Sequence, residues 1–565
     1  MLTKLKSLQL LFFLALFATL SVWALAGNPA NAKQPVSELA EATEYQVPLF
    51  DEMGDLHHPI STDSALAQRY FDQGLTLAYG FNHAEAARSF REAARLDPNC
   101  ALCYWGVAYV LGPNINAGMA DDAVPEAYSA IQKAIELADH SSDREKAYIQ
   151  ALATRYVADP VADRSALDKV YADAMGKVAQ QYPDDLDAST LYAEALMDTT
   201  PWNYWTAEGD PRPATRKLLN TLESVLRRNP NHAGANHLYI HATEASLHPE
   251  WAEAAADRLR TLVPGSSHLV HMPAHTYIRV GRYHDSAIAN QKAIAADKDY
   301  LTQCHAQGIY PLAYMPHNDH FLWASATMEG RRELAISAAR TMSAKIDQEM
   351  MRADGMGFLQ DFWITPLYAL TRFGQWDEIL AEPQPAADLI YPNGVWRYAR
   401  GMALTAKGEF DQAARELSKL TEIAANPALE KITIFDLNST DNLMKIAFDV
   451  LAGELAAKQG NYNRAIAHLE KAVEREDKLN YAEPEAWHHP VRQSLGAVLL
   501  EAGRAAEAEA VYREDLVEHP RNGWSLFGLA QSLEAQGKSN AAQIVQKRFE
   551  EAWRYADVTL TSSRI

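Results

Sequence analysis

Residues 67–100 read AQRYFDQGLTLAYGFNHAEAARSFREAARLDPNC, and this stretch decides the fold. Its apolar and small residues recur at helical spacing in two segments, so it fits a helix–turn–helix unit of 34 residues. Gly74 and Ala86 are important because two helices approach closely only where a side chain is small or absent. The stretch therefore predicts a pair of packed helices.

An aromatic, two small residues, an aromatic, a small residue and a proline stand in order at Tyr70, Gly74, Ala86, Phe90, Ala93 and Pro98. The same frame recurs towards the C-terminus at Gly401, Gly408 and Ala413; at Gly453, Gly460 and Ala465; at Gly496, Gly503, Ala508, Tyr512 and Pro520; and at Ala530, Gly537 and Ala542. This pattern resembles the tetratricopeptide repeat family. The resemblance covers nearly all of the chain after residue 64. It implies an all-α fold, a right-handed α-solenoid of helix–turn–helix repeats.

The pattern divides the 565 residues into five segments. We expect a signal peptide at 1–32 and a polar, disorder-prone segment at 33–63. Tetratricopeptide-like repeats with insertions follow at 64–230, histidine-rich repeats at 231–345 and regular repeats at 346–565. The array is expected to be one continuous solenoid with hinges at its irregular breaks, because a repeat array grows without a single central core.

The N-terminus has the order of a secretory signal. Lys4 and Lys6 precede an apolar run, Leu8–Val22, and two small-residue cleavage patterns end at Ala26 and Ala32. A membrane anchor would need a longer apolar span without a cleavage pattern. The sequence therefore predicts a periplasmic or secreted protein, with no membrane span after signal removal.

Net charge and cysteine content exclude several classes of function. A net charge of −21 argues against nucleic acid and anionic lipid as partners. Three cysteines do not make a disulfide framework. Cys100 and Cys103 form a C-x-x-C motif, but a helix precedes it where a thioredoxin-like site needs a strand. We expect a local Cys100–Cys103 disulfide and a free Cys304, which lies in an extra loop together with His305.

Histidine is concentrated between His232 and His320, where eleven of the nineteen histidines stand. In the family that the chain resembles, set positions of each first helix face the concave groove. Small residues such as Ala252, Gly281 and Gly330 assign this frame without use of the histidines. The resemblance then implies that one wall, built by three consecutive units, carries His237, His241, Glu244, His268, His271, His275, His317 and His320.

A wall of this kind suits a transition metal. Histidines four residues apart on a helix present both imidazoles to one point, as in helical zinc sites. Imidazole binds zinc, copper, iron and nickel, and the thioethers of Met272 and Met315 would favour copper if they reach inward. Seven histidines exceed one tetrahedral zinc and would suit two metal ions. Glu244 has three open roles: ligand, hydrogen-bond partner that orients a histidine, or catalytic general base.

Other features have plainer interpretations. Pro273 suggests that a helix begins there, which would leave His271 before it rather than on its face. His232, His248 and His284 are interpreted as surface or cap residues, and His488 and His489 as a cap before a regular unit. Two aromatics of an insertion, Trp202 and Trp205, are candidates to cover the groove.

Two classes of function follow. The first is an exported metalloprotein with copper or zinc on the seven histidines, which would act as a metal-dependent oxidoreductase or hydrolase with Glu244 moving a proton. The alternative is a metal-free periplasmic scaffold for protein–protein interactions, the commonest role of the family, with a protein or peptide partner in the groove. The sequence leaves enzyme activity open.

Overall fold

The computed structural model of the chain describes residues 47–206, 208–303 and 310–565. The predicted signal peptide, Cys304 and His305 lie outside these residues. The chain divides into two compact units. Unit 1 comprises Met1–Pro273 and Ala295–Pro311, and unit 2 comprises Ala274–Ile294 and Leu312–Ile565.

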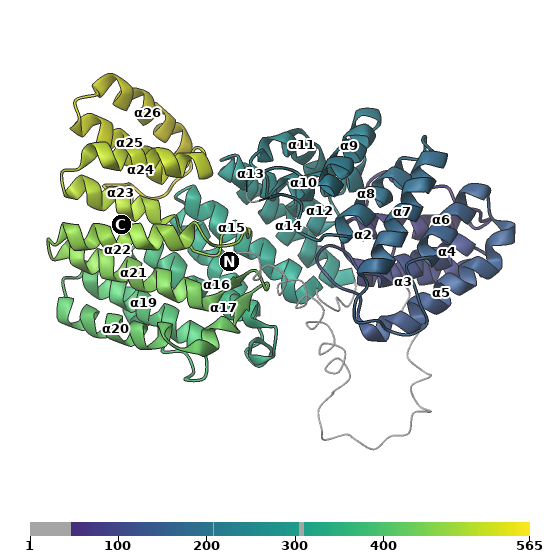
Figure 1. The fold of residues 1–565 in the computed structure, drawn as a ribbon, viewed down its shortest axis with the longest axis horizontal. Coiled ribbons are helices and arrows are strands. Elements are labelled where there is room, and N and C mark those ends of the chain that lie inside the picture. Colours follow the sequence, from purple (N-terminus) through teal and green to yellow (C-terminus); the bar gives the residue numbers. More distant parts are fainter. Residues whose placement is uncertain (1–46, 207, 304–309) are drawn as a thin grey trace, which may run out of the picture. The chain divides into compact units, whose positions relative to one another are not determined.

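Unit 1 is built of helices that pack on their neighbours in sequence, as the purple to teal part of Figure 1 shows. They are α2 (Ala65–Tyr79), α3 (His83–Leu96), α4 (Ala101–Leu111), α5 (Val124–Leu137), α6 (Asp143–Ala153), α7 (Ser165–Gln181), α8 (Leu186–Asp198), α9 (Pro213–Arg228), α10 (Ala233–Thr243), α11 (Glu253–Leu262) and α12 (Ser267–His271). Short 3-10 turns occupy η3 (Asp121–Ala123), η4 (Ala138–His140) and η5 (Pro249–Ala252). The later part of α14 (Tyr283–Gln303) also belongs to this unit.

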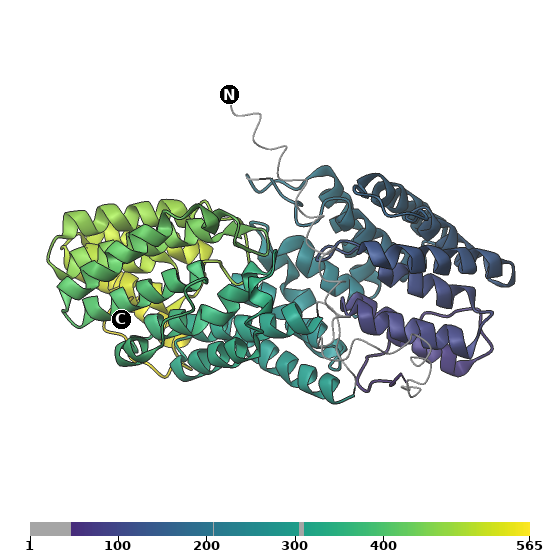
Figure 2. The ribbon, with the colours of Figure 1, turned by 90° about the horizontal axis from the view of Figure 1, so that it is seen from below.

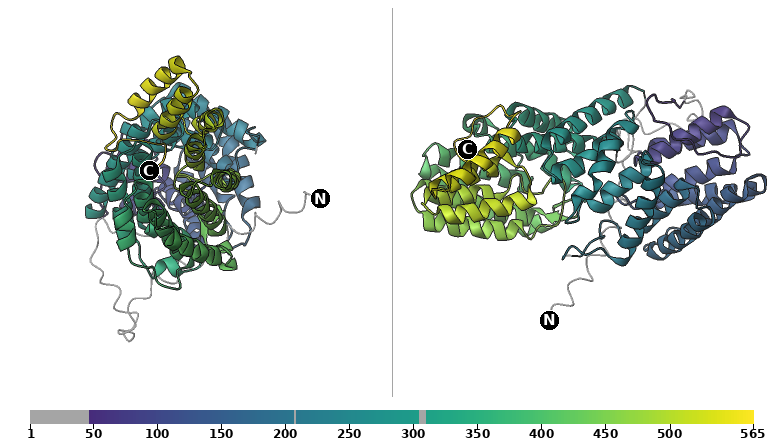
Figure 3. Two further views of the ribbon diagram at one scale, coloured as in Figure 1. Left: turned by 90° about the vertical axis from the view of Figure 1, so that its left-hand side faces the viewer. Right: turned by 90° about the horizontal axis from the view of Figure 1, so that it is seen from above.

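Unit 2 repeats this arrangement, and Figures 2 and 3 show its green and yellow helices stacked in consecutive pairs. Its elements are most of α13 (Pro273–Arg279), the start of α14, the end of the π-helix η6 (Tyr310–Tyr314), α15 (Met315–Met328), α16 (Arg332–Lys345), η7 (Met350–Arg352), α17 (Gly357–Arg372), α18 (Trp376–Ala381), α19 (Ile390–Ala406), α20 (Phe410–Ala424), η8 (Pro427–Glu430), β1 (Thr433–Ile434), β2 (Asn438–Ser439), α21 (Thr440–Lys458), α22 (Tyr462–Glu476), α23 (Val491–Glu501), α24 (Ala505–Glu518), α25 (Gly523–Ala535) and α26 (Ser539–Ala552).

The helix pairs form for the reason that the sequence suggests. In the first pair, a Cβ atom at Gly74 of α2 would lie 2.8 Å from the ring of Phe90 on α3, and Phe90 is fully buried. Only glycine lets the two helices approach this closely. The all-α prediction is confirmed. The antiparallel pair of β1 and β2 is the only sheet among the described residues.

Two local features test the sequence analysis. Cys100 and Cys103 are joined by a disulfide at the start of α4, as predicted. The segment before Asp63 is not disordered over its described part, which begins at Val47. The backbone N–H of Phe50 donates to Gln73 Oε1 at 2.7 Å, and that of Ser61 donates to Glu145 Oε1 at 2.6 Å. The polar composition therefore supplies hydrogen bonds to unit 1 rather than a solvated tail.

Pro273 ends one helix and begins another. The helix α12 stops at His271, and α13 starts at Pro273, since proline cannot donate the hydrogen bond that would continue α12. His271 therefore precedes the proline-initiated helix, as the sequence suggests. No helix in residues 47–206, 208–303 and 310–565 combines the length and the apolar composition that a membrane crossing requires.

Candidate metal centre

The helix α10 supplies two histidines from one face. His237 and His241 stand four residues apart, and both are buried. His232 caps the start of the helix, because its Nδ1 accepts from the backbone N–H of Ala235 at 3.2 Å. A Cβ atom at Gly234 would lie 2.7 Å from the ring of Tyr79, so glycine brings α10 against the end of α2. The first turn of α10 thus sets where its two imidazoles lie.

His237 is oriented by the backbone of α2. Its Nδ1 lies 2.6 Å from the carbonyl oxygen of Tyr79. A carbonyl oxygen can only accept a hydrogen bond, so Nδ1 carries the proton and Nε2 carries the lone pair of the neutral ring. This is the tautomer that a metal bound at Nε2 requires.

His241 is oriented in the same way by Glu244, which follows the last residue of α10. His241 Nδ1 donates to Glu244 Oε1 at 2.7 Å, and both side chains are almost fully buried. The carboxylate fixes the ring and makes its Nε2 more basic. Of the three roles open to Glu244, the geometry supports the role of orienting a histidine.

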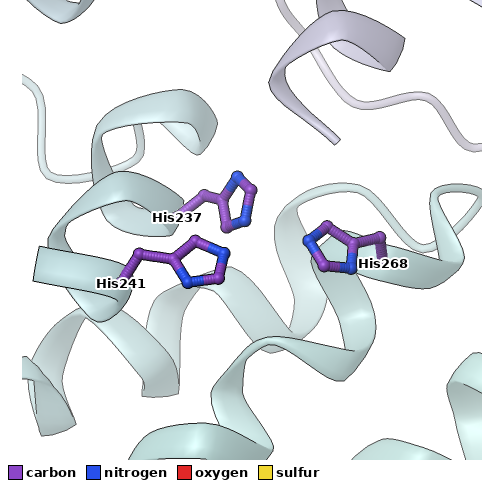
Figure 4. A group of neighbouring side chains, drawn as sticks. All are labelled: His237, His241 and His268. Carbon is purple, nitrogen blue, oxygen red and sulfur yellow. The ribbon is translucent and has the colours of Figure 1, made fainter. Parts of the chain in front are cut away.

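The third histidine comes from α12. The ring of His268 lies 4.9 Å from that of His237 and 6.2 Å from that of His241, centroid to centroid. One ring nitrogen of each residue lies within 4.8 Å of the other two, and Figure 4 shows the three rings around a common space. Tetrahedral zinc with Zn–N bonds of about 2.0–2.1 Å separates its nitrogens by about 3.3 Å. Small ring rotations would therefore bring the three nitrogens onto one ion.

A buried hydrogen-bond network around Asp187 includes Tyr79 and His232, which both lie next to the start of α10. The Asp187 carboxylate accepts from the Tyr79 hydroxyl at 2.7 Å and pairs with His58 Nδ1 at 2.8 Å and His232 Nε2 at 3.2 Å. Burial opposes the charge of Asp187, but the hydrogen bonds from His232 and His58 lower its pKa below the usual value. His232 is thus a cap, as expected, but it is buried rather than on the surface.

Two aromatic side chains lie against the cluster, Phe81 beside all three histidines and Trp202 beside His241. The ring centroid of Phe81, which is buried, lies 4.7 Å from that of His237, 5.7 Å from that of His241 and 5.6 Å from that of His268. The Trp202 ring meets His241 edge-on at 5.3 Å. A Cβ atom at Gly80 would lie 2.7 Å from Ser266 Oγ, so the turn after α2 closely approaches the start of α12.

The remaining histidines of the predicted wall have other surroundings. His271 is buried in unit 1, with its ring 6.0 Å from that of His268. In unit 2, His275 Nδ1 pairs with Glu483 Oε2 at 3.1 Å, and the His275 ring lies 5.6 Å from that of His317. Met272 and Met315, the predicted thioethers, are both buried.

His320 is surrounded by aromatic rings. It stacks on Trp323 at 5.1 Å with an interplanar angle of 7°, and its edge meets Phe362 at 5.1 Å. Burial lowers the pKa of His320 to about 3. In the described part of the chain, it belongs to no group of side chains spaced for a metal ion.

Histidines outside the predicted wall are partly on the surface and partly buried. His248 is a surface residue, as expected, and pairs with Glu250. His284 is partly buried, pairs with Glu329 and stacks on Tyr555. His488 and His489 are not caps, since Pro490 occupies the cap position of α23 and no side chain caps this helix. Both are buried in unit 2 beside Trp487, and burial lowers their pKa values.

Unit 2 also contains a cavity of about 460 Å³ that sequence reasoning missed. Aromatic and charged side chains line it, among them Arg279, Tyr283, Trp323, Glu476, Trp487 and His519. His519 is held between two carboxylates, Glu485 at 2.7 Å and Asp515 at 3.0 Å, which raise its pKa despite its burial. The cavity depends on the loop between α22 and α23, whose sequence carries no repeat pattern.

Sequence reasoning also missed Phe81 and the Tyr79 carbonyl. A carbonyl oxygen has no sequence signal. Phe81 has one, because it stands at the turn position of its repeat where later repeats carry glycine, such as Gly281 and Gly330. A bulky residue in that place could have directed attention to the turn.

Comparison with known proteins gives one family match and several distant structural likenesses. The tetratricopeptide repeat model matches residues 450–478, which cover the end of α21 and all of α22. No curated protein matches the chain.

Three solved structures illustrate the likenesses. One is the crystal structure of the APC/C hetero-tetramer Cut9–Hcn1, with 13% identity, a TM-score of 0.30 and coverage of 86% of this chain and 76% of that chain. The human IFIT1 dimer with m7Gppp-AAAA has 12% identity, a TM-score of 0.30 and coverage of 91% and 97%. The P58(IPK) TPR domain has 12% identity, a TM-score of 0.23 and coverage of 84% and 99%. TM-scores this low carry no argument about function. Residues 450–478 thus match a tetratricopeptide repeat, and the helices of each unit pack on their neighbours in sequence as in an array of helix pairs.

Proposed function

We propose that this protein is a tetratricopeptide repeat scaffold that binds one transition metal ion, copper or zinc, in unit 1 through His237, His241 and His268. The observation that carries the proposal is the convergence of three buried imidazoles, with one nitrogen of each within 4.8 Å of the others. The Nδ1 contacts of His237 and His241 prepare the Nε2 atoms for a metal.

The charges support a cation in this place. Three neutral imidazoles bring no charge, and the Glu244 carboxylate beside His241 compensates part of the charge of a bound ion. Because Glu244 already accepts a hydrogen bond from His241 Nδ1, we assign it the role of positioning this ligand rather than of moving a proton. The proposal is therefore metal binding, and it includes no reaction.

Metal analysis tests the proposal. The full chain, stripped with a chelator and reconstituted with Cu or Zn, should retain close to one ion after exhaustive dialysis. The variants H237A and H268A should retain much less, since the loss of a ligand or its orienting partner commonly lowers metal affinity by about 10–100-fold. H248A removes a surface histidine and is the matched control. Wild-type protein that rebinds no transition metal above the buffer level would end the proposal.

A second candidate, a metal-free scaffold for a protein partner, is favoured by unit 2. The matched repeat lies there, and α19, α21, α23 and α25 contain no histidine. The cavity between aromatic and charged side chains offers space for an anchoring side chain of a partner. A purified partner that binds the chelator-treated chain as tightly as the metal-loaded chain would support this function, whereas binding that requires metal would oppose it.

Export remains a proposal that rests on the apolar run Leu8–Val22 and the cleavage patterns that follow it. The mature protein should begin at Gly27 or Lys33, which intact-mass measurement of the purified protein tests. A mass that includes Met1 would contradict it.

A further inference from the structure

The turn between α2 and α3 holds Phe81 in an unfavourable backbone conformation. Its φ angle is +54°, in the left-handed region that bulky residues rarely adopt. The corresponding turn positions of later repeats carry glycine, with φ of +75° at Gly281 and +78° at Gly460. Such strain persists where the surroundings enforce it, and it is concentrated at ligand-binding sites.

Trp202 shows the same combination. Its φ angle is +60°, and its ring contacts His241. Among the described non-glycine residues of unit 1, Phe81 and Trp202 are the aromatic ones with a positive φ. Phe81 lies against all three histidines and Trp202 against His241, although the two aromatic residues are far apart in sequence. The strained turns therefore serve to place two aromatic rings on the histidine cluster.

The Phe81 ring covers the cluster broadly. It is inclined by 23° to the His241 ring and by 32° to the His268 ring, and it meets His237 edge to face. A water molecule bound as a fourth ligand needs polar partners of its own, and an aromatic face offers only weak ones. The aromatic cover thus favours an ion whose coordination is complete with three nitrogen ligands.

The charge of the groups around the site also decides which ion it favours. The energy needed to take an ion out of water grows with the square of its charge, so a buried site holds a monovalent ion more readily than a divalent one. Glu244, through His241, supplies one negative charge. This one hydrogen-bonded carboxylate matches the charge of a monovalent ion more closely than that of a divalent ion. An aromatic face also attracts a nearby cation.

We infer that the site takes the cuprous ion, Cu(I), in a three-coordinate form, with Phe81 and Trp202 as the cover that excludes a fourth ligand. This inference rests on the proposed metal binding by His237, His241 and His268. Zinc in proteins is almost always four-coordinate, with a fourth protein ligand or a water, and Cu(II) prefers tetragonal nitrogen and oxygen sets. The cover disfavours both.

Competition titrations and X-ray absorption test the inference. The stripped full chain is titrated anaerobically with Cu(I) against a cuprous chelator and, separately, with Zn(II) against a zinc chelator. Wild-type protein should prefer Cu(I), and the copper absorption edge should report three nitrogen ligands. In F81G the backbone keeps its positive φ without strain, but the cover is lost. The ratio of Cu(I) to Zn(II) affinity should then fall by about 10-fold or more, in the range of supporting residues around metals.

Phe435 offers a matched control. It is also a phenylalanine with a positive φ, +49°, but it belongs to unit 2. F435G should leave both affinities unchanged. An unchanged affinity ratio in F81G, or a four-coordinate ion in the wild-type protein, would overturn the inference while metal binding stands. Binding of neither metal to the wild-type chain would remove the proposed function itself, and the inference with it.

Discussion

The helices α10 and α15 carry similar histidine patterns and use them differently. On α10, His237 and His241 stand four residues apart, and on α15, His317 and His320 stand three apart. In unit 1, the two α10 rings meet a third imidazole, that of His268. In unit 2, the His320 ring lies flat on Trp323.

The histidines of the two helices differ in the groups that orient their rings. His237 and His241 donate from Nδ1 to the Tyr79 carbonyl and to Glu244, which makes Nε2 the nitrogen that carries the lone pair in each ring. His320 is positioned by aromatic packing, and burial is the cause of its lowered pKa. Helical spacing therefore provides a shared face, whereas a metal site also needs acceptors that orient the rings and a ligand from a neighbouring helix.

The largest expected effect compares ligands across the two units. H237A, H241A and H268A should each lower metal affinity by about 100-fold, because each removes one of three ligands. H320A should leave the affinity unchanged, because His320 packs against aromatic rings in unit 2. Isothermal titration of stripped protein with one metal measures both sets.

One result would contradict the contrast between His237 and His320. A similar loss of affinity in H320A and in H237A would mean that the predicted wall of seven histidines acts together. Circular dichroism of each variant verifies that the helices are retained.

A smaller effect is expected from the partner that orients His241. E244A removes the acceptor of the Nδ1 proton and should lower metal affinity by about 10-fold. E244Q keeps an acceptor oxygen but loses the charge, so its effect should be smaller. E250Q is the matched control, because Glu250 accepts from His248 at 3.0 Å on the surface. Equal affinities of E244A and wild type would show that Glu244 does not position the ligand.

The sequence allowed the fold to be predicted because its signal is local. Gly74 and Phe90 lie within the same repeat, and their contact follows from the spacing of small and aromatic residues. The pair of His237 and His241 could be predicted for the same reason. The contacts of Phe81 and Tyr79 with α10 could not, since they join residues more than a hundred positions apart. No pattern within a single helix encodes such a contact.

The smallest expected effect is on the free energy of unfolding, and it comes from His320 in unit 2. His320 stays neutral in the folded chain down to a pKa of about 3, but in the unfolded chain it is protonated below about 6.5. The unfolded state thus binds more protons, and folding stability falls as the pH drops through this window. From pH 7 to pH 5.5, His320 alone should cost about 1.2 kcal/mol of unfolding free energy. H320F keeps the aromatic packing and removes the titration, so denaturant unfolding of the stripped chain should show a shallower acid decline for the variant. Parallel declines for the variant and the wild type would mean that His320 is protonated within the fold. In that case α15 would offer its imidazole to a ligand after all, and the contrast with α10 would lose its physical basis.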